Sequence, residues 1–542
     1  MYDVDFNKFN GTPRLFLDFI NFREPAARFF GRDFRDIDCY RAVASQIDKT
    51  SYNRTKLASI ISEATLSFGL SAPATENIRK LAQPNTLCVF AGQQVGMLLG
   101  PMYTVLKALS AYKLAKKLES DLGRPVVPCF WMASDDHDFA EVKSVSILDR
   151  DGNCRNVSYE PARPPDGVPM AEIVLDDRVT VFLDEVESVL LRTEFRATIV
   201  SWIRDAYRSS RTVSEAFGIL MERLLSSFGI VPVDPNFAGM KELFSPVFRR
   251  EIENHGVIFE LFERRSREII ESGYHRQVHK TADSLNLFYS DGVRRNILVS
   301  GQDFSFDGSG ETMSRDGLLE LLSREPCRFS PNVALRPIAQ CFAIPTISQI
   351  VGPSEAAYFS QIGPLFDYHG VPLPVVRPRV FATMLEPHIA KIFRKLGIDF
   401  ASLSNDKEFE VGRIIRVQFP DEIESQTVEL RDKIEKMIAA IAANVKEKDL
   451  ESYQALDYAR RRILHELNHL SKKLFMAHKK KHEDVSQRVR KVAAFVLPCN
   501  KFQERVLSPA YLANKFGPDI FERIEKKLDI NSTAHQLAEI EP

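Results

Sequence analysis

Two short apolar runs with a helical segment between them lie in the first quarter of the chain. Residues 86–91 and 125–132 are apolar and rich in β-branched or aromatic residues, which is typical of buried strands. Between them, residues 102–122 place leucines at positions 106, 109, 114 and 118, a helical spacing. A strand, helix and second strand form a βαβ unit with parallel strands. The pattern predicts a Rossmann-like parallel sheet.

Further elements of the same kind follow along the chain. Residues 229–233, 296–300 and the apolar runs within ALRPIAQCFAIPTISQIVGP (334–353) are strand candidates. Residues 33–83, 184–228 and 241–272 have helical spacing. We therefore expect an α/β domain over residues 1–384, with helical connecting insertions at about 184–228 and 241–272.

The pattern changes to heptads in the last third of the chain. Apolar positions in residues 421–445 (Ile423, Leu430, Ile434, Met437, Ile441) are separated by seven, four, three and four, and residues 456–475 have a similar rhythm. The charged segment KEKDLES joins the two. This predicts an antiparallel coiled-coil hairpin within a helical domain at 385–497, and a C-terminal segment, 498–542, that packs on the core. We expect a homodimer through the coiled coil; a rigid spacer within one chain is the alternative.

Composition excludes several classes of protein. With 72 basic and 73 acidic residues among 542, the chain has no overall charge that would indicate a nucleic-acid or membrane partner. The seven cysteines are scattered and contain no C-x-x-C pair, which favours reduced thiols. The N-terminal residues do not resemble a signal peptide, and no apolar run is long enough to span a membrane. We expect a cytoplasmic globular protein.

The segment AGQQVGMLLGPMY joins the first predicted strand to its helix, where open α/β sheets bind ligands. It matches neither the P-loop nor the dinucleotide-binding pattern. Its side chains can still form hydrogen bonds at a cleft, and the following helix start suits an anion. The candidate binding residues are Gly92, Gln93, Gln94, Gly96 and Tyr103. A tight turn that needs glycines for backbone reasons explains the glycines equally well.

The segment FWMASDDHDFAE follows the second predicted strand and gathers five titratable groups. Asp138 and Glu141 have the spacing of a helix N-cap and its capping-box partner, although Asp138 remains a candidate binding residue. Asp135, Asp136 and His137 are candidate catalytic residues, because a histidine between carboxylates has a tunable pKa. A metal cage and a loop that grips the substrate are the alternatives. We predict no tightly bound metal.

Two further groups of polar residues are candidates for ligand binding. Within SPNVALRPIAQCFAIPTISQIVGPSEAAYF, polar side chains lie among apolar ones and need partners, and Arg336 can fork onto a carboxylate or phosphate. A core ion pair is the alternative. In AHKKKHED the lysines could bind a phosphate, or simply form a solvated helix face. These candidates are Arg336, Gln340, Gln349, Glu355, Tyr358, Lys479, Lys480 and Lys481.

The segment HELNH matches the short zinc-protease pattern, with His465 and His469 four residues apart. The heptad that runs through Ile463, Leu467 and Leu470 places both histidines on the outer face of the helix. Zinc catalysis also needs a third ligand and a cleft. We therefore interpret the match as coincidental.

Several of these segments together resemble one known family. AGQQVGMLLGPMY, FWMASDDHDFAEV, SPNVALRP, IVGPSEAAYFSQI, KKKHEDVSQRV and FQERVLSP are similar to blocks of the bacillithiol synthase (BshC-like) family, the cysteine ligase of bacillithiol biosynthesis. The resemblance spans most of the chain. It implies a Rossmann core related to the nucleotide-binding fold of class I aminoacyl-tRNA synthetases, and a coiled-coil dimerisation domain. It also implies addition of cysteine to glucosaminyl malate.

Amide formation from a carboxylate needs activation, so we expect ATP, or ADP as its product, with Mg²⁺ as an option. Gln93, Gln94 and the adjoining helix start would hold the nucleotide or acyl group. His137 would take the proton of the attacking ammonium and Arg336 would hold the malate carboxylate. The chain has neither a HIGH-type nor a KMSKS-type block, which leaves the mode of activation open. The alternatives are a non-catalytic dimeric scaffold that binds a metabolite or nucleotide, and a metal-dependent hydrolase built on residues 135–138.

Overall fold

The computed structural model describes residues 2–446 and 450–541. Two compact units divide the chain. The first runs from the N-terminus to Leu385 and resumes at Lys501, and the second spans Glu386–Asn500. The helical unit is thus inserted into the chain of the α/β unit.

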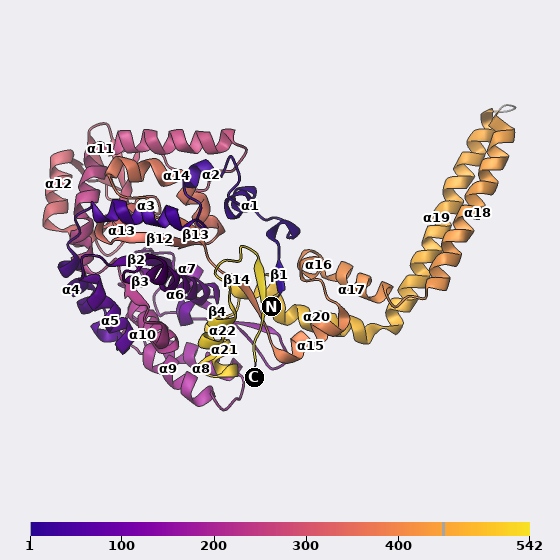
Figure 1. Ribbon diagram of the computed structural model, residues 1–542, viewed down its shortest axis with the longest axis horizontal. Coiled ribbons are helices and arrows are strands. Elements are labelled where there is room, and N and C mark those ends of the chain that lie inside the picture. Colours follow the sequence, from indigo (N-terminus) through magenta and orange to yellow (C-terminus); the bar gives the residue numbers. More distant parts are fainter. Residues whose placement is uncertain (1, 447–449, 542) are drawn as a thin grey trace. The chain divides into compact units, whose positions relative to one another are not determined.

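A five-stranded parallel sheet forms the centre of the first unit (Figure 1). Its order is β13-β12-β2-β3-β6, and every neighbouring pair is parallel. The strands are β2 (Leu87–Gln94), β3 (Val126–Ala133), β6 (Val231–Val233), β12 (Thr346–Val351) and β13 (Val375–Pro378). Helix α6 (Tyr103–Leu122) connects β2 to β3. The predicted Rossmann-like βαβ unit is confirmed.

Burial on both faces explains why the central strands are continuous apolar runs. Helix α6 packs on β2 and β3, α3 (Ile37–Asp48) on β12 and β13, and α5 (Ala72–Leu81) on β3 and β6. Residues 87–92 and 126–132 are all buried. A parallel sheet covered by helices leaves no face for alternating polar residues. Gly92 permits close strand pairing, since a Cβ there would lie 3.0 Å from the Trp131 Cβ.

A second sheet of the first unit is antiparallel, with the order β10-β9-β8-β7-β11. Its strands are β7 (Ser284–Ser290), β8 (Arg294–Ser300), β9 (Asp303–Phe306), β10 (Thr312–Ser314) and β11 (Phe329–Pro331). The strand expected at 296–300 exists, but it belongs to this sheet and not to the parallel one. The turns that join β7 to β8 and β8 to β9 are short, so these strands pair as antiparallel hairpins. Parallel pairing would need a long crossover connection between the strands.

The apolar segment before β12 is helical, which corrects the strand interpretation of ALRPIAQCFA. Helix α13 spans Arg336–Ala343 and has Pro337 in its first turn, a position that proline favours. Its apolar residues pack inward, and Arg336 and Gln340 lie one helical turn apart. The following TISQIV forms β12 as expected.

Helices fill the predicted insertions. The first contains α8 (Val179–Val189), α9 (Arg196–Ala206) and α10 (Val213–Leu225), and the second is α11 (Ala238–Glu271), whose helical geometry breaks at Asn254. Other helices of this unit are α1 (Arg14–Ile20), α2 (Ala27–Phe30), α4 (Arg54–Ala64), α7 (Phe139–Val142), α12 (Arg315–Arg324), α14 (Pro353–His369), α21 (Pro509–Phe516) and α22 (Ile520–Lys527).

The two termini of the chain meet in a small three-stranded sheet. β15 (His535–Glu539) pairs antiparallel with β1 (Tyr2–Val4) and parallel with β14 (Phe381–Leu385). A separate hairpin consists of β4 (Ser144–Leu148) and β5 (Cys154–Ser158). The segment after Lys501 therefore belongs structurally to the α/β unit.

The second unit contains a long helical hairpin. Its helices are α15 (Pro387–Leu396), α16 (Phe400–Asn405), α17 (Lys407–Arg416), α18 (Asp421–Lys446), α19 (Leu450–Lys481) and α20 (Glu483–Val496). Phe419 lies 5.9 Å from Phe475 between ring centroids, and Glu435 pairs with Arg460. These contacts run antiparallel and confirm the predicted coiled coil. Residues 447–449 of the KEKDLES segment lie outside the described residues.

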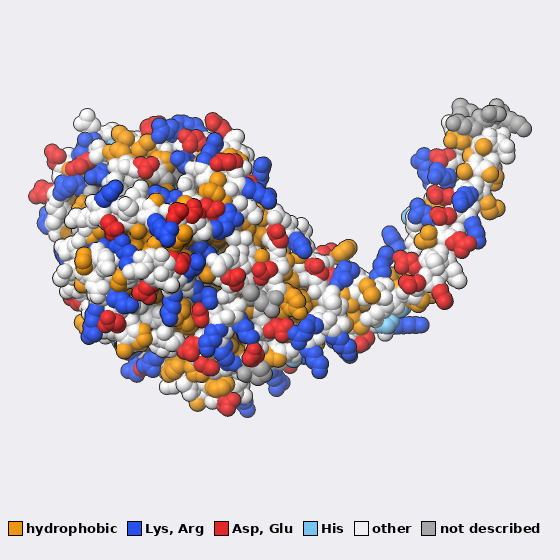
Figure 2. Space-filling view, in the orientation of Figure 1, with side chains coloured by type: hydrophobic (Ala, Val, Ile, Leu, Met, Phe, Trp, Pro, Cys, Tyr) orange, Lys and Arg blue, Asp and Glu red, His pale blue; other side chains and the backbone are white. Residues whose placement is uncertain are grey.

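Charged side chains of both signs are interspersed over the face of the molecule in Figure 2, in line with the balanced composition. The seven cysteines are all free, as their spacing predicts. Among the described residues, no helix is long and apolar enough to cross a membrane.

Candidate active site

A cavity of about 640 Å³ lies at the carboxyl ends of β2 and β3. The parallel sheet and the five-stranded antiparallel sheet both contribute to it, with Phe288 and Arg294 coming from the antiparallel one. Ten of the predicted site residues line this cavity: Gly92, Gln93, Gln94, Tyr103, Asp135, Asp136, His137, Arg336, Glu355 and Tyr358. Three segments that lie far apart in the sequence thus meet at one edge of the parallel sheet, where open α/β folds bind ligands.

Lys107, on α6, contacts the end of β2 and fixes the side chains around it. Its ammonium group is buried and donates to the Gly92 carbonyl at 2.8 Å and to Gln93 Oε1 at 2.9 Å, and it pairs with Glu355 Oε2 at 2.6 Å. Burial lowers the pKa of Lys107, while Glu355 opposes that shift. All three ammonium hydrogens have acceptors in the protein. Lys107 therefore fixes Gln93 and Glu355 and has no donor left for a ligand.

Gln94 connects the end of β2 to the acidic cluster after β3. Its Nε2 donates to Asp136 Oδ2 at 2.6 Å and to Glu141 Oε2 at 3.0 Å. Asp138 caps α7 by accepting from the Glu141 backbone N–H at 3.3 Å, which confirms the predicted N-cap. The expected capping-box bond from Glu141 does not form, because the Glu141 carboxylate accepts from Gln94. The Asp138 N–H donates instead to Asp136 Oδ1 at 3.4 Å. The cluster thus divides into a helix cap and a group that faces the cavity.

His137 lies beside Arg294, whose Nη1 is 3.3 Å from the imidazole Nδ1. Because arginine can only donate, Nδ1 accepts and the ring proton lies on Nε2. Arg294 is held by Ser330 Oγ at 3.0 Å and the Pro331 carbonyl at 2.9 Å. Burial, followed by the charge of Arg294, lowers the pKa of His137. The imidazole is therefore neutral near neutral pH.

Asp135 forms a buried ion pair with Lys241 of α11. Next to it, Asp234 accepts from Ser134 and from Ser214 Oγ, the latter at 2.9 Å. Burial lowers the pKa of Lys241 and raises that of Asp234. Asp135 thus links the cavity to α11, and its charge is already matched by Lys241.

Arg336 is held by a hydrogen-bonded network of buried side chains. Its Nη1 donates to Gln340 Oε1 and its Nη2 to the Tyr358 hydroxyl, both at 2.9 Å, and Gln340 donates to Gln349 at 2.9 Å. The guanidinium carbon lies 5.5 Å from the centre of the Trp131 ring. Gln340 and Gln349 are buried behind the cavity and do not line it. They orient Arg336, which keeps further N–H donors for a ligand.

Arg379, at the end of β13, is the second guanidinium fixed at the cavity. Glu504 accepts from both of its Nη atoms, at 2.9 and 2.6 Å, in a buried bidentate pair. This pair lowers the pKa of Glu504, although burial acts in the opposite direction. The next residue, Arg505, also lines the cavity and is exposed; its guanidinium has no hydrogen bond or ion pair within residues 2–446 and 450–541. The segment after Lys501 thus adds a cation to the cavity.

The remaining predicted site residues lie elsewhere. Gly96 faces Gly100 and Val142, away from the cavity lining, and Asp138 is occupied as a cap. Lys479, Lys480 and Lys481 form the last turn of α19 in the helical unit, where Lys479 pairs with Glu408. None of the three lysines lines the cavity at the ends of β2 and β3.

The described residues contain no group of three histidine, cysteine or acidic side chains arranged to hold a metal ion. In HELNH, His465 and His469 are both exposed on α19, as the heptad predicts. Nδ1 of His469 lies 4.0 Å from Glu466 Oε2. The zinc-protease interpretation therefore has no structural support in the part of the chain that the structure describes.

Sequence reasoning missed the basic residues that organise the cavity, namely Lys107, Lys241, Arg294, Arg379 and Arg505, and with them Glu504. A signal was present for two of them. Lys107 lies within the apolar helix MYTVLKALSAY and Arg379 within the apolar run VVRPRVF, so each is a charge that needs a buried partner. Arg294 and Arg505 belong to charged segments that look solvated in the sequence.

Comparison with known proteins assigns the family. The model of the N-terminal Rossmann-like domain of the bacillithiol biosynthesis protein BshC matches residues 3–380, and that of its C-terminal coiled-coil domain matches residues 382–540. The chain belongs to the BshC family. The resemblance expected from the sequence blocks is confirmed.

Curated relatives agree over nearly the full length. A protein of Salinibacter ruber named "Putative cysteine ligase BshC" is 29% identical over 527 residues, covering 97% of this chain and 96% of the relative. Proteins with the same name from Solibacter usitatus (29% identical, 97% of both chains) and Heliobacterium modesticaldum (30%, 88% of both) are similar. This BshC-family chain is accordingly an enzyme of the ligase class.

Proposed function

We propose that this BshC-family chain joins the carboxyl group of cysteine to the sugar amine of glucosaminyl malate, forming bacillithiol with the consumption of ATP. The family and the names of the relatives support a cysteine ligase. The observation that carries the proposal is the cavity, where fixed guanidinium groups and a neutral imidazole beside carboxylates meet at the end of a parallel sheet.

The basic side chains suit anionic substrates. Arg336, oriented by Gln340 and Tyr358, would bind the malate carboxylates, because a fixed guanidinium holds a carboxylate in a bidentate manner. Arg379 and Arg505 would bind the phosphates of the nucleotide. Gln93 and Gln94, with the start of α6, would hold the nucleotide or the acyl group.

The donor set fits a polyanion, since Arg336, Arg379 and Arg505 all line the cavity. ATP, with Mg²⁺ as an option, would supply the phosphoryl or adenylyl group that turns the cysteine carboxylate into an anhydride. The sugar nitrogen then attacks the carboxyl carbon, the C–N bond forms, and the phosphate or AMP leaves with one carboxyl oxygen. The protein must bind both substrates and accept a proton from the ammonium.

His137 would accept this proton, because its lowered pKa keeps it neutral and a base needs a lone pair. In the present geometry Arg294 donates to that lone pair on Nδ1. We propose that Arg294 turns toward an anionic group of the substrate when the amine binds, so that Nδ1 faces the ammonium. Asp136, with Oδ1 3.9 Å from Nδ1, would stabilise the imidazolium.

We also propose that the ligase is a homodimer through the hairpin of α18 and α19. Large apolar side chains are exposed along these helices, among them Val428, Met437, Ile441 and Tyr458. Exposed apolar patches of this kind mark interaction sites.

Mass spectrometry of the purified protein with cysteine, glucosaminyl malate, ATP and Mg²⁺ tests the reaction. We expect a new amide product together with one equivalent of AMP or ADP, and the nucleotide distinguishes adenylation from phosphorylation. Wild-type protein that forms no amide from intact substrates would contradict the ligase proposal. An equal yield of amide without ATP would contradict the proposed activation.

A further inference from the structure

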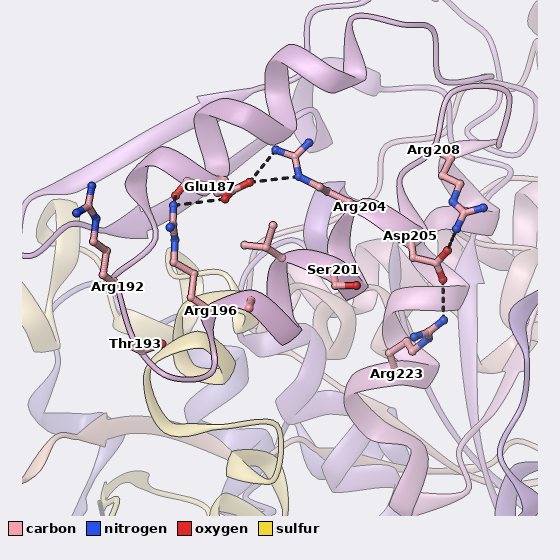
Figure 3. A pocket seen from close by; sticks show the side chains of 11 residues that line it. Glu187, Arg192, Thr193, Arg196, Ser201, Arg204, Asp205, Arg208 and Arg223 are labelled. Atoms are coloured by element: carbon pink, nitrogen blue, oxygen red, sulfur yellow. Dashed lines mark hydrogen bonds and ion pairs between the residues drawn. The ribbon is translucent and has the colours of Figure 1, made fainter.

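A second concave surface, with five arginines among its eleven lining residues, lies on α8, α9 and α10 (Figure 3). Its volume is about 1000 Å³, and its charged lining is Arg192, Arg196, Arg204, Arg208, Arg223, Glu187 and Asp205. We call this surface the arginine hollow. It shares no lining residue with the catalytic cavity.

One carboxylate holds two of these arginines. Glu187, on α8, lies between Arg196 and Arg204 of α9, with N–O distances of 3.6 and 2.7 Å (Figure 3). Arg204 also contacts Asp184 at 2.6 Å. Two guanidinium groups about two helical turns apart are thereby held in fixed orientations on one wall.

A second carboxylate, near the C-terminal end of α9, has a similar arrangement. Asp205 lies between Arg208, in the turn that follows α9, and Arg223 of α10, and the contact with Arg223 is 2.6 Å. Asp205 and Glu187 thus each hold one pair of arginines.

The positive charge of the hollow exceeds its negative charge. Five guanidinium groups line it against the carboxylates of Glu187 and Asp205, with Asp184 at its edge. Arg192 has no ion pair or hydrogen bond to another residue in the described ranges, and the Nε of Arg196 is buried without a partner. A solvated network of surface ion pairs would need no such excess and would contribute little to stability.

We propose that the arginine hollow is a binding site for a small molecule that carries more than one phosphate charge. A phosphate group presents several terminal oxygens and can accept from two guanidinium groups at once. A ligand with a single carboxylate would add only one negative charge, as Glu187 and Asp205 each do, and part of the positive charge of the hollow would stay unpaired. The acids between the arginines, and the limited extent of the hollow, disfavour a nucleic-acid backbone, which needs a continuous basic stripe.

Isothermal titration of the full-length protein with inorganic pyrophosphate tests this site. The test variant is Arg192→Gln with Arg223→Gln, which removes two positive charges from the hollow and leaves its carboxylates in place. Arg79→Gln is the matched control, because Arg79 is an exposed helical arginine paired with Glu76 outside the hollow. Arg505→Gln reports on phosphate binding in the catalytic cavity, because Arg505 lines that cavity and is proposed to bind the phosphates of the nucleotide. Thermal unfolding of each variant verifies that it folds.

We expect saturable pyrophosphate binding that is at least about tenfold weaker in the double variant and is retained in Arg79→Gln and Arg505→Gln. Orthophosphate should bind more weakly than pyrophosphate to the wild type. The proposal is overturned if the wild type does not bind pyrophosphate, if the double variant binds it as tightly as the wild type, or if Arg505→Gln alone abolishes binding.

Discussion

At His137 a neighbouring arginine affects the pKa and the tautomer of the imidazole. Burial and the charge of Arg294 both favour the neutral ring, and the contact between Nη1 and Nδ1 fixes the proton on Nε2. The carboxylates of Asp136 and Asp138 act in the opposite direction and are outweighed. The lowered pKa of His137 thus results from burial and, second, from an arginine on a strand of the antiparallel sheet that sequence reasoning did not connect with the site.

Replacing Arg294 by glutamine should raise the pKa of His137, because it removes the positive charge that disfavours the imidazolium. NMR titration of the histidine Cε1–H resonances measures this directly, with His137→Gln used to assign the signal. In the wild type His137 should titrate below its ordinary value of about 6.5. An unchanged or lower pKa in the Arg294→Gln variant would exclude the proposed electrostatic control.

The free energy of unfolding should decrease with falling pH through His535. This residue is fully buried and its pKa is lowered to about 4, whereas in the unfolded chain it is about 6.5. The unfolded chain therefore binds the proton first, and stability is lost as the pH falls from about 6.5 toward 4. The loss from this residue at pH 5 is roughly 2 kcal/mol.

Urea denaturation at pH 7 and pH 5 measures this effect. A His535→Gln variant should lose less stability between the two pH values than the wild type does. His369, whose pKa burial also lowers to about 4, should leave the variant with a residual pH dependence. A variant with the full wild-type dependence would show that His535 does not contribute.

At the scale of elements, the packing of α6 and α14 against the sheet depends on a buried charge. Lys107 of α6 contacts the end of β2 and Glu355 of α14, which in turn accepts from the Gly352 backbone N–H at 2.8 Å. One ion pair thus fixes two helices and the strand end that carries Gln93.

Replacing Glu355 by glutamine should destabilise the protein by roughly 2–3 kcal/mol, because Lys107 is left buried without a counter-charge. This loss of unfolding free energy is smaller than is usual for breaking a fully buried ion pair, because the Glu355 side chain is 20% exposed. In urea denaturation, Lys107→Met combined with Glu355→Gln should be more stable than Glu355→Gln alone. A double variant that is less stable than the single one would contradict this account of the pair.

The helices and strands predicted correctly are those whose hydrophobic pattern fits only one type of secondary structure. β2, α6 and β3 are long, apolar and correctly spaced, and the heptads of α18 and α19 persist over several turns. ALRPIAQCFA was misassigned because a short apolar run fits a buried helix as well as a buried strand. Seven of the ten site residues followed from topology, because they lie at the ends of β2 and β3 or in the segments just after them. Arg336, Glu355 and Tyr358 were predicted instead as polar side chains among apolar ones. Arg294 and Arg505 reach the cavity through long-range packing that no local pattern encodes.

At the scale of the whole molecule, the helical unit is inserted between two segments that both reach the catalytic cavity. Arg379 precedes the insertion and Arg505 follows it. The α/β unit is therefore incomplete without the segment that follows the hairpin.

Changing exposed apolar residues of the hairpin should abolish the proposed dimer. Met437 and Tyr458 are 67% and 69% exposed. We expect light scattering coupled to gel filtration to give a dimeric mass for the wild type and a monomeric mass for Met437→Glu with Tyr458→Glu. Exposed Leu66→Glu, in the α/β unit, is the control. A monomeric wild type would refute the dimer.

The rate of amide formation in variants of the cavity tests the central claim most directly. The measurement compares the wild type with Arg336→Gln, His137→Gln and, as a matched control on the coiled coil, His465→Gln, each with cysteine, glucosaminyl malate and ATP. We predict that the first two variants lose at least about a hundredfold in rate, as expected when a substrate clamp or a general base is removed, and that His465→Gln retains the wild-type rate. Wild-type rates in folded Arg336→Gln and His137→Gln would show that the chemistry takes place outside this cavity.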